Sequence, residues 1–343
     1  MSEFFSTAGL PEIVAGIAVL ALNAYALLGG GDFGGGVWDL LASGPRRDAQ
    51  RALIANAIAP IWEANHVWLI VVVVVMFTAF PAAFAALSIV LHIPLTIMLV
   101  GIVLRGSAFM FRSYGSHTVN ARDRWGAAFA GASVVTPIVL GIIIGAISSG
   151  AVARAATAPG SMSFADTYVR PWWAPFPLAV GGFTLAIFSF LAAIYATVAA
   201  RDDALREDFR ARALGSAVAV LVFAALSLLL ARAGAPRIVS GVAGSPWSLL
   251  LHVCTGSAAV VAIAAVWRRR YGIARVAAAL QVSLILWGWA FSEYPYLIPD
   301  ALTIRAAAAP FITLRLLLIG LAAGAAILVP SLRYMLRTFA ARS

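Results

Sequence analysis

The sequence predicts an all-α integral membrane protein with about nine transmembrane helices, organised as one domain over residues 1–343. Two features of the composition support this fold class: 62% of the residues are hydrophobic and only 11% are charged. A mean hydropathy of +0.95 points the same way. Such a composition excludes a water-soluble globular protein, because too few polar side chains are present to cover a surface that faces water.

Apolar stretches of about 20 residues, the length that crosses a hydrocarbon core of roughly 30 Å, recur along the chain. The nine candidates have approximate cores at residues 10–28, 52–78, 82–104, 126–149, 174–199, 212–231, 247–267, 274–292 and 311–332. The second stretch is the least regular, because Pro60, Glu63 and His66 precede its apolar run. We expect a kinked helix there, entered from an amphipathic segment.

The basic residues predict the orientation of these helices, and all 24 of them are arginine. If the N-terminus lies outside, eighteen arginines fall on inner segments and five on outer segments, with Arg315 inside the last helix. The outer five are Arg154, Arg170, Arg232, Arg237 and Arg305. The positive-inside rule therefore predicts an outer N-terminus and a cytoplasmic C-terminus. Because the start of the chain lacks a basic n-region, we expect no cleavable signal peptide.

Cysteine usage and charge distribution exclude several functional classes. A single cysteine, Cys254, excludes a disulfide framework and a cysteine-ligated metal site built from this chain alone. Any metal must therefore be held by histidine, by carboxylate or by a partner. The net charge of +10 comes from arginines at the ends of apolar runs, which is typical of membrane topology and not of nucleic-acid binding.

Acidic residues inside apolar runs are the first candidates for function, because an ionisable group in the bilayer costs a few kcal/mol. The candidates are Glu12, Asp32, Glu63 and Glu293. Asp32 lies among six glycines in residues 29–36, which predicts a sharp exit turn at the inner end of the first stretch. Its carboxylate either packs against a neighbouring helix or caps the turn in solvent. Glu293 is expected at the outer surface among aromatic anchors.

The densest polar and aromatic cluster lies in residues 59–70. On a helix, Trp62, Asn65 and His66 share one face, and Glu63 is an i, i+3 neighbour of His66. Glu63 stands about a dozen residues beyond the inner helix start, hence about 18 Å deep, which is mid-membrane. A carboxyl at that depth suits proton carriage, with His66 as a relay or hydrogen-bond partner. The alternative is a buried Glu–His pair that only fixes helix packing.

Two arginines lie at the inner end of the third stretch. Either Arg105 or Arg112 pairs with Asp32 across helix ends, or both extend their charged heads toward water. For Arg112 we expect that the guanidinium reaches toward water.

Several blocks, in order along nearly the whole chain, together resemble subunit II of the cytochrome bd-type quinol oxidases. The matching blocks are residues 31–36, 57–70, 105–112, 287–297 and 328–332. The Trp-acid-x-Asn-x-Val-Trp pattern at residues 62–68 is fairly specific, whereas the glycine block alone is weak.

The resemblance implies a partner role in a bacterial cytoplasmic membrane. In that family subunit I carries the haems and the quinol site, and subunit II is a haem-free half that packs against it. Together they oxidise quinol and reduce dioxygen to water. We therefore expect subunit I as an obligate partner, with or without small single-helix subunits. Haem b and haem d, or haem b only, are expected in that partner, and no catalytic residue or metal ligand is expected on this chain.

The resemblance also implies roles for individual residues. Carried over by position, Glu63, Asp32 and His66 lie on a proton pathway from the cytoplasm, with Asp32 near its inner entrance. Trp62 lies beside Glu63 on that path, and Arg105 has a structural or ion-pair role. The residues expected at an oxygen-access channel or at the subunit interface are Trp62, Trp68 and Asn65.

The chain departs from the family pattern at several positions. Gly29 and Met110 stand where acids are usual. Glu63 replaces an Asp, Ala64 a Gly, and His66 a Gln or Glu. Two proton carriers of the family pattern are therefore absent. Either His66 compensates, or this chain belongs to a branch with altered proton entry or haem content.

Two interpretations from other classes stay open. A secondary transporter would use the glycine-interrupted first stretch and the Glu63 and His66 pair, although no second counterpart of residues 29–36 is found. A redox subunit would ligate haem directly through His66 or His92. His92 and His252 stand alone in apolar surroundings, where a satisfied interior histidine is expected rather than a haem ligand.

Overall fold

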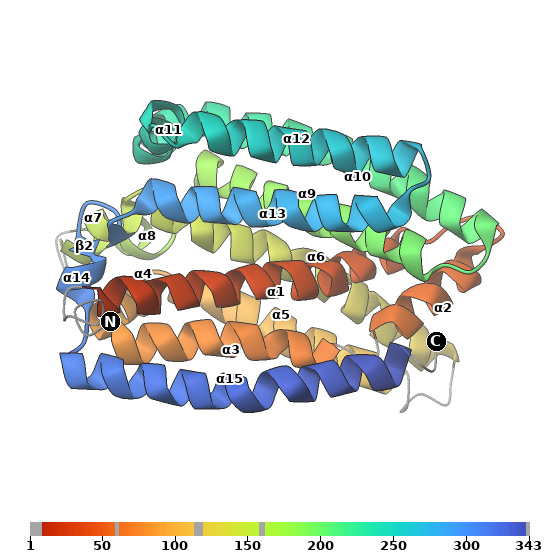
Figure 1. Ribbon diagram of the computed structural model, residues 1–343, viewed down its shortest axis with the longest axis horizontal. Helices are drawn as coiled ribbons and strands as arrows, with labels where there is room; N and C mark the ends of the chain where they lie inside the picture. Colours follow the sequence, from red (N-terminus) through yellow and green to blue (C-terminus); the bar gives the residue numbers. More distant parts are fainter. Residues whose placement is uncertain (1–8, 59–61, 113–118, 158–161, 341–343) are drawn as a thin grey trace.

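The computed structural model describes residues 9–58, 62–112, 119–157 and 162–340 as a bundle of long helices that run roughly along one axis (Figure 1). Eight helices in this part of the chain are long and apolar enough to cross a membrane. They are α1 (Leu10–Leu40), α5 (His92–Met110), α6 (Val119–Ser148), α9 (Pro175–Ala199), α10 (Asp203–Gly234), α12 (Ser248–Trp267), α13 (Tyr271–Glu293) and α15 (Phe311–Ala340).

A ninth span is present if α3 (Trp62–Ala79) and α4 (Pro81–Val90) are counted together, since they form a pair bent by 116°. On that count the prediction of an all-α membrane protein with about nine spans is confirmed. The division into one domain stays a prediction.

The bend between α3 and α4 corrects the expected third stretch at residues 82–104. The break falls at Phe80, whose backbone leaves the helical region (φ −134°, ψ 57°), and Pro81 begins α4. Proline lacks the N–H that would continue α3, so a new helix starts there. The third stretch is therefore divided between α4 and α5. The expected second stretch is also two helices, α2 (Arg47–Ile58) and α3, and the expected kink near Pro60 lies outside the described residues.

The glycine block of residues 29–36 is helical, so the predicted exit turn is wrong. Helix α1 continues through it and ends at Leu40. The glycines instead allow other helices to approach closely. A Cβ on Gly34 would lie 2.0 Å from the backbone oxygen of Phe188 in α9, and one on Gly36 would lie 2.1 Å from the Ser133 hydroxyl in α6. The same residue type serves turns and close helix contacts, and here it serves the contacts.

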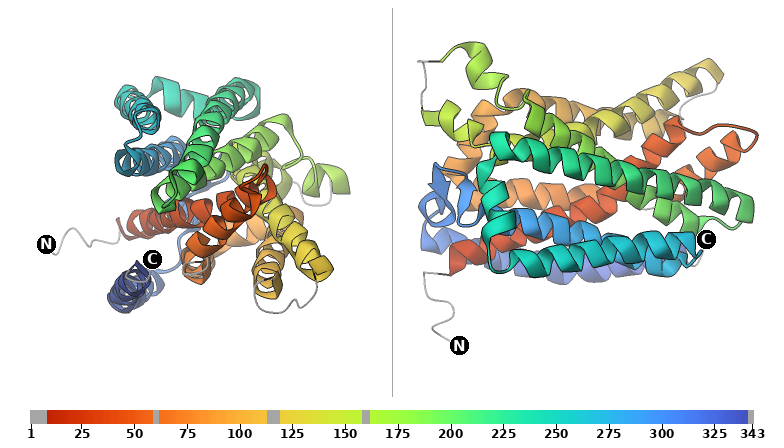
Figure 2. Two further views of the ribbon diagram at one scale, coloured as in Figure 1. Left: turned by 90° about the vertical axis from the view of Figure 1, so that its right-hand side faces the viewer. Right: turned by 90° about the horizontal axis from the view of Figure 1, so that it is seen from above.

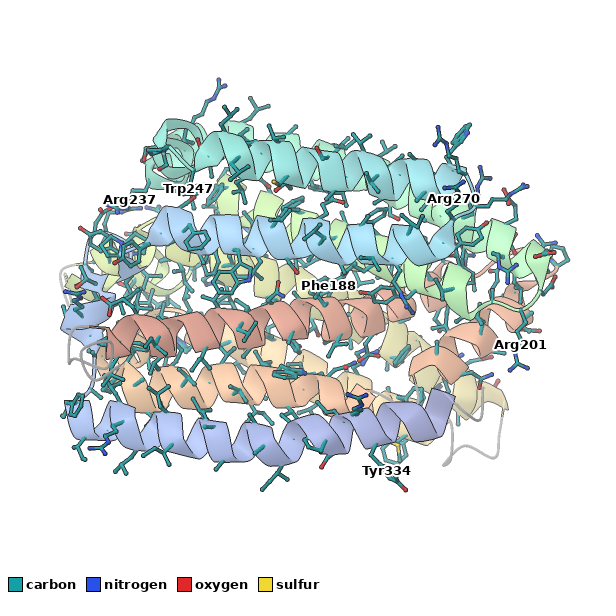
Figure 3. All side chains as sticks on the ribbon, in the orientation of Figure 1. Phe188, Arg201, Arg237, Trp247, Arg270 and Tyr334 are labelled. Atoms are coloured by element: carbon teal, nitrogen blue, oxygen red, sulfur yellow. The ribbon has the colours of Figure 1, made fainter. Side chains whose placement is uncertain are left out.

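The core forms where α1, α6 and α9 pack together, with α10 and α13 against α9. Phe33, Phe188 and Phe209 are among its most buried side chains, and Phe188 lies near the middle of the bundle in Figure 3. Helix α15 lies at the edge, mainly against α3 and α1, as the end-on view of Figure 2 shows.

The short elements gather at one end of the bundle (Figure 1). They are α7 (Ala151–Thr157), α8 (Phe164–Tyr168), α11 (Pro236–Gly244), β1 (Tyr296–Ile298), β2 (Leu302–Thr303) and α14 (Ile304–Ala307). Strands β1 and β2 pair antiparallel, with Tyr296 opposite Thr303.

Helix α1 begins at this end of the bundle and α15 finishes at the opposite one (Figure 1). Arg201 and Arg270 lie at the end where α15 finishes, and Arg237 lies at the other (Figure 3). We call the end with Arg201 and Arg270 the inner end and the end with Arg237 the outer end, after the predicted orientation. That orientation itself stays a prediction.

Candidate functional site

A buried ion pair joins α1 and α5. Arg105 is 1% exposed and Asp32 is 2% exposed. The guanidinium donates to both carboxylate oxygens, from Nη1 to Oδ2 at 2.9 Å and from Nη2 to Oδ1 at 2.6 Å. The Nη2 group also donates to the backbone oxygen of Asp32 at 3.0 Å. Of the two pairings considered for Asp32, the structure forms the one with Arg105.

The remaining N–H group and the faces of the Arg105 guanidinium also have partners. Its Nε donates to the hydroxyl of Ser133 in α6 at 2.9 Å. The rings of Phe33 and Phe129 each lie 4.8 Å from the guanidinium carbon. A buried charge pair is stable only when such extra hydrogen bonds offset its desolvation. The pair therefore ties three helices, α1, α5 and α6, at one point.

A second ion pair repeats the first, seven residues further along both helices. Arg112 donates from Nη1 to Asp39 Oδ2 at 2.8 Å and from Nη2 to Asp39 Oδ1 at 3.1 Å. Arg51 Nε donates to the backbone oxygen of Asp39 at 3.3 Å. The expectation that Arg112 extends into water is therefore wrong, because a buried acid on α1 attracts it. Sequence reasoning missed Asp39, although the shared spacing of seven residues in both helices was a usable signal.

His66 lies next to the first ion pair. Its ring centroid is 6.1 Å from that of Tyr25 and 6.2 Å from that of Phe33, the residue after Asp32. Its Nδ1 atom is buried and has no hydrogen-bond partner in the described part of the chain. The structure thus brings together His66, Asp32 and Arg105, three of the residues selected from the sequence.

Two neighbours of His66 on α3 share this property. The Nδ2 of Asn65 and the Nε1 of Trp68 are also buried without a partner among the described residues, and Asn65 is only 1% exposed. Buried polar atoms are nearly always hydrogen-bonded. Three such atoms within the first two turns of α3 therefore indicate that water, a ligand, another chain or side chains outside the described residues complete this site.

Glu63 and Trp62 lie in the first turn of α3, since that helix begins at Trp62. Their side chains lie outside what the structure describes. The helical backbone places Glu63 one turn before His66. The proton-carrying role expected for Glu63 stays a prediction, as does the role of Trp62.

The other polar candidates lie away from this cluster. His92 is exposed, with its Nδ1 2.9 Å from the oxygen of Ile89 and its ring 5.1 Å from that of Tyr168. Glu12 pairs with Arg305 at the outer end. Glu293 is the last residue of α13 and lies at the outer end, as expected, but at 5% exposure it is buried within the bundle.

An apolar cavity of about 220 Å³ lies between α1, α6, α9 and α13. Its lining includes Tyr25, Phe188 and Trp289, and it contains no histidine, cysteine or methionine. These are the most common axial ligands of haem iron. Tyr25 is the one lining residue of a type that can ligate haem iron. Among the described residues, no three His, Cys, Asp or Glu side chains gather as metal ligands would.

Comparison with known proteins gives one family. Residues 10–339 match the family described as cytochrome bd terminal oxidase subunit II. The chain is 33% identical over 127 residues to cytochrome bd ubiquinol oxidase subunit 2 of Bacillus subtilis (strain 168), covering 37% of this chain and 36% of that protein. It is 30% identical over 129 residues to cytochrome bd-I ubiquinol oxidase subunit 2 of Escherichia coli (strain K12), covering 38% and 33%. These alignments span about a third of each relative.

Longer but weaker similarities cover most of the chain. A putative cytochrome bd menaquinol oxidase subunit II of Bacillus subtilis (strain 168) is 24% identical over 288 residues, 80% of each protein. A chain of the bd oxidase from Geobacillus thermodenitrificans superposes with a TM-score of 0.78 at 23% identity. That match covers 96% of this chain and 98% of the other, and it shows that the two share a fold.

Proposed function

Because the chain belongs to the cytochrome bd terminal oxidase subunit II family, we propose that it is the haem-free second subunit of a membrane complex that oxidises quinol and reduces dioxygen to water. The fold of helices long enough to cross a membrane supports this role. The complex would lie in a bacterial cytoplasmic membrane, with the haem-bearing subunit I as its partner. Haem b, with or without haem d, would supply the iron chemistry on that partner.

This chain would contribute proton delivery from the inner end. The single observation that carries this role is a set of three buried atoms on α3 that have no partner among the described residues. They are Asn65 Nδ2, His66 Nδ1 and Trp68 Nε1. Waters bound to these atoms would form the hydrogen-bonded chain that a proton needs. Glu63, one turn before His66, would take up the proton, and His66 would pass it along that chain.

Asp32 and Arg105 would act on this path as fixed charges. Both oxygens of the Asp32 carboxylate already accept hydrogen bonds from Arg105, and releasing them would leave an uncompensated charge in a buried site. We therefore assign Asp32 as a buried charge beside His66 that orients the imidazole and nearby water, and Arg105 as the residue that holds it.

The partner subunit would cover the side of the bundle formed by α3 and α15. Large apolar side chains on these helices are exposed, among them Ile70 and Phe77 on α3 and Ile327 on α15. Helix α15 has few neighbours of its own (Figure 2). An interface there would bring the partly exposed Trp68 near the boundary between the subunits, where oxygen could reach the reaction site, with the buried Asn65 behind it.

Neither alternative gains a supporting observation. A transporter site would need a broken first helix, whereas α1 is continuous from Leu10 to Leu40. Haem ligation through His92 gains no support, because His92 is exposed and no described histidine lines the apolar cavity.

The test is Glu63→Gln in the purified complex. We expect quinol-driven oxygen consumption to fall about tenfold or more, because a positioned proton-transfer group is lost, while the amount of complex and its haem spectrum stay unchanged. Glu63→Asp, which restores the residue usual in the family, should keep most of the activity. Glu12→Gln at the outer end is the matched control and should have no effect. Full turnover in Glu63→Gln would contradict the proposed proton role.

A further inference from the structure

The turn between α12 and α13, at the inner end of the bundle, is made of arginine. Helix α12 ends at Trp267 and α13 begins at Tyr271, so the whole connection is Arg268, Arg269 and Arg270. Figure 3 shows Arg270 at that end of α13. Both helices are long and apolar enough to cross a membrane. The three arginines therefore stand where the chain leaves the apolar region and enters it again.

Helix α10 brings two more arginines to this turn. Arg210 donates from Nε to the backbone oxygen of Val266 at 3.2 Å and from Nη2 to that of Trp267 at 3.3 Å. The guanidinium carbon of Arg206 lies 5.9 Å from the centre of the Tyr271 ring. Together with the arginine one turn into α13, these residues form what we call the inner basic patch: Arg206, Arg210, Arg268, Arg269, Arg270 and Arg275.

Acids balance only part of the charge of this patch. Asp203 pairs with Arg206, and Glu207 pairs with both Arg210 and Arg269. The three remaining arginines have no carboxylate partner in the part of the chain that the structure describes; they are Arg268, Arg270 and Arg275.

The other two acids of the same segment of α10 have partners elsewhere. Asp202 accepts a hydrogen bond from the backbone N–H of Ala204 at the start of α10, and Asp208 pairs with Arg46. The patch therefore holds six arginines against two acids, and like charges this close repel each other unless negative charge comes from outside the chain.

The positive-inside rule does not by itself require this excess. At the same end of the bundle, Asp39 pairs with Arg112 and lies 3.9 Å from Arg51. Those arginines count toward topology as well, yet the chain neutralises them. The inner basic patch differs because its charge is left open.

The backbone of Arg269 is a second indication that charge is retained here. Its φ is 59°, a left-handed conformation in which the Cβ of an ordinary residue crowds the following carbonyl oxygen. Glycine would avoid this cost. The sequence nevertheless has an arginine at the position, and backbone strain of this kind is typical of functional sites.

An exposed apolar face continues directly from the patch along α13. Trp267 is 68% exposed, and Ile273, Val276 and Leu280 are 48%, 65% and 52% exposed. The last three lie on one face of the helix, because they are three and four residues apart. Aromatic and basic side chains beside an apolar face mark the boundary between lipid headgroups and hydrocarbon. The patch is therefore placed at the level of lipid phosphate groups.

We propose that the inner basic patch binds an anionic phospholipid of the membrane leaflet at the inner end. Arg268 and Arg270 would donate to its phosphate oxygens, which match the fork of N–H groups that arginine presents. The exposed face of α13 would contact its acyl chains. Basic clusters directly beside a spanning helix are typical of anionic-lipid recognition, whereas free phosphate would leave the apolar face unused. This binding goes beyond the proposed function and does not require turnover of the complex.

The experiment titrates the purified, delipidated complex with phosphatidylglycerol and with phosphatidylcholine of the same chain length. Bound lipid is measured by native mass spectrometry at low salt. We expect phosphatidylglycerol to bind more tightly, and the double variant R268Q/R270Q to weaken its binding at least about tenfold, because two arginines near the headgroup are lost. The double variant R268K/R270K keeps the charges without the fork and should lie between the two. Added salt should weaken the binding by screening.

The matched control is R47Q/R124Q. Both residues are exposed arginines of inner segments outside the patch, so this variant removes the same charge and should bind phosphatidylglycerol as the unmodified complex does. An equal loss in the control, or equal binding of the two lipids, would overturn the proposal. Displacement of phosphatidylglycerol by millimolar inorganic phosphate at constant ionic strength would overturn the assignment to a lipid.

The single variants R268Q and R270Q cover the case in which the double variant does not assemble. Both residues are exposed, so each substitution should leave the fold intact, as the haem spectrum and elution volume of the complex would show. We expect each to weaken the binding of phosphatidylglycerol several-fold. Unchanged affinity in both single variants would also overturn the proposal.

Discussion

Two neighbouring regions differ in how their buried polar groups are hydrogen-bonded. One is the pair of ion pairs between α1 and α5, and the other is the first two turns of α3. Arg105 uses Nε, Nη1 and Nη2 in hydrogen bonds within the chain. On α3, buried atoms of Asn65, His66 and Trp68 have no partner among the described residues. A polar group that is fully bonded holds the fold together, whereas one left open is available to water or a ligand. Substitutions on α3 should therefore mainly lower activity, and substitutions on α1 and α5 should mainly lower stability.

The largest effect should come from Arg105→Leu. Removing the guanidinium leaves the Asp32 carboxylate buried and unpaired, which costs about 3–5 kcal/mol of unfolding free energy. We expect little assembled complex in membranes and a much lower Tm in what is recovered. The double variant Asp32→Asn with Arg105→Gln should recover part of the loss, because neither remaining group is charged. Normal assembly of Arg105→Leu would contradict the view that this pair stabilises the fold.

The next effect should come from Gly34→Ala, which tests the close approach of α1 and α9. The new Cβ would lie 2.0 Å from the Phe188 backbone oxygen, so the helices must separate, at a cost of about 1–3 kcal/mol or more. Gly16→Ala on the same helix has nothing within 4 Å and should be neutral or slightly stabilising. Thermal unfolding of the two variants gives the comparison, and equal Tm values would contradict it.

Arg112→Gln should have a smaller effect than Arg105→Leu. The Arg112 side chain is 22% exposed, against 2% for Arg105, so water can partly replace the lost contacts to Asp39. We expect about 1–2 kcal/mol of lost stability. If Arg112→Gln costs as much as Arg105→Leu, the depth of burial does not set the strength of these pairs.

The smallest effect on stability, with a clear effect on activity, should come from His66→Phe. The imidazole Nδ1 makes no hydrogen bond within the described chain, so an apolar ring of similar shape should change Tm little. Quinol-driven oxygen consumption should fall several-fold, because the relay is lost. His66→Gln, a residue usual in the family, should retain most of the activity. A large drop in Tm with unchanged turnover would show that His66 only packs.

The fold class could be predicted because apolar runs of membrane length dominate the composition. Details that depend on contacts between distant segments could not be predicted from the sequence. The glycines of residues 29–36 suit a turn or a close helix contact equally well, and only the positions of Phe188 and Ser133 decide between them. Pro81 was visible in the sequence, yet a proline does not by itself set the angle of the break, which is 116° here.

The candidate site was found only in part. The pairing of Asp32 with Arg105 was one of two arrangements considered, since both residues were expected at inner helix ends. In the structure Asp32 lies within α1, which continues to Leu40. Asp39 was missed because it follows an apolar segment and resembles an ordinary solvated acid. The burial of Glu293 at the end of α13 depends on neighbours that are far away in the sequence, so the local aromatic residues could not predict it.

The repeat of the two ion pairs has a consequence for how α1 and α5 align. Arg105 faces Asp32 and Arg112 faces Asp39, with the same spacing in two helices that run in the same direction. Sliding α5 along α1 by seven residues, about 10 Å at 1.5 Å per residue, would place Arg105 against Asp39. Asp32 and Arg112 would then each lack an ion-pair partner. Only one sliding position neutralises all four side chains. The two ion pairs thus favour a single position of α5 along α1 when the helices associate during insertion of the chain.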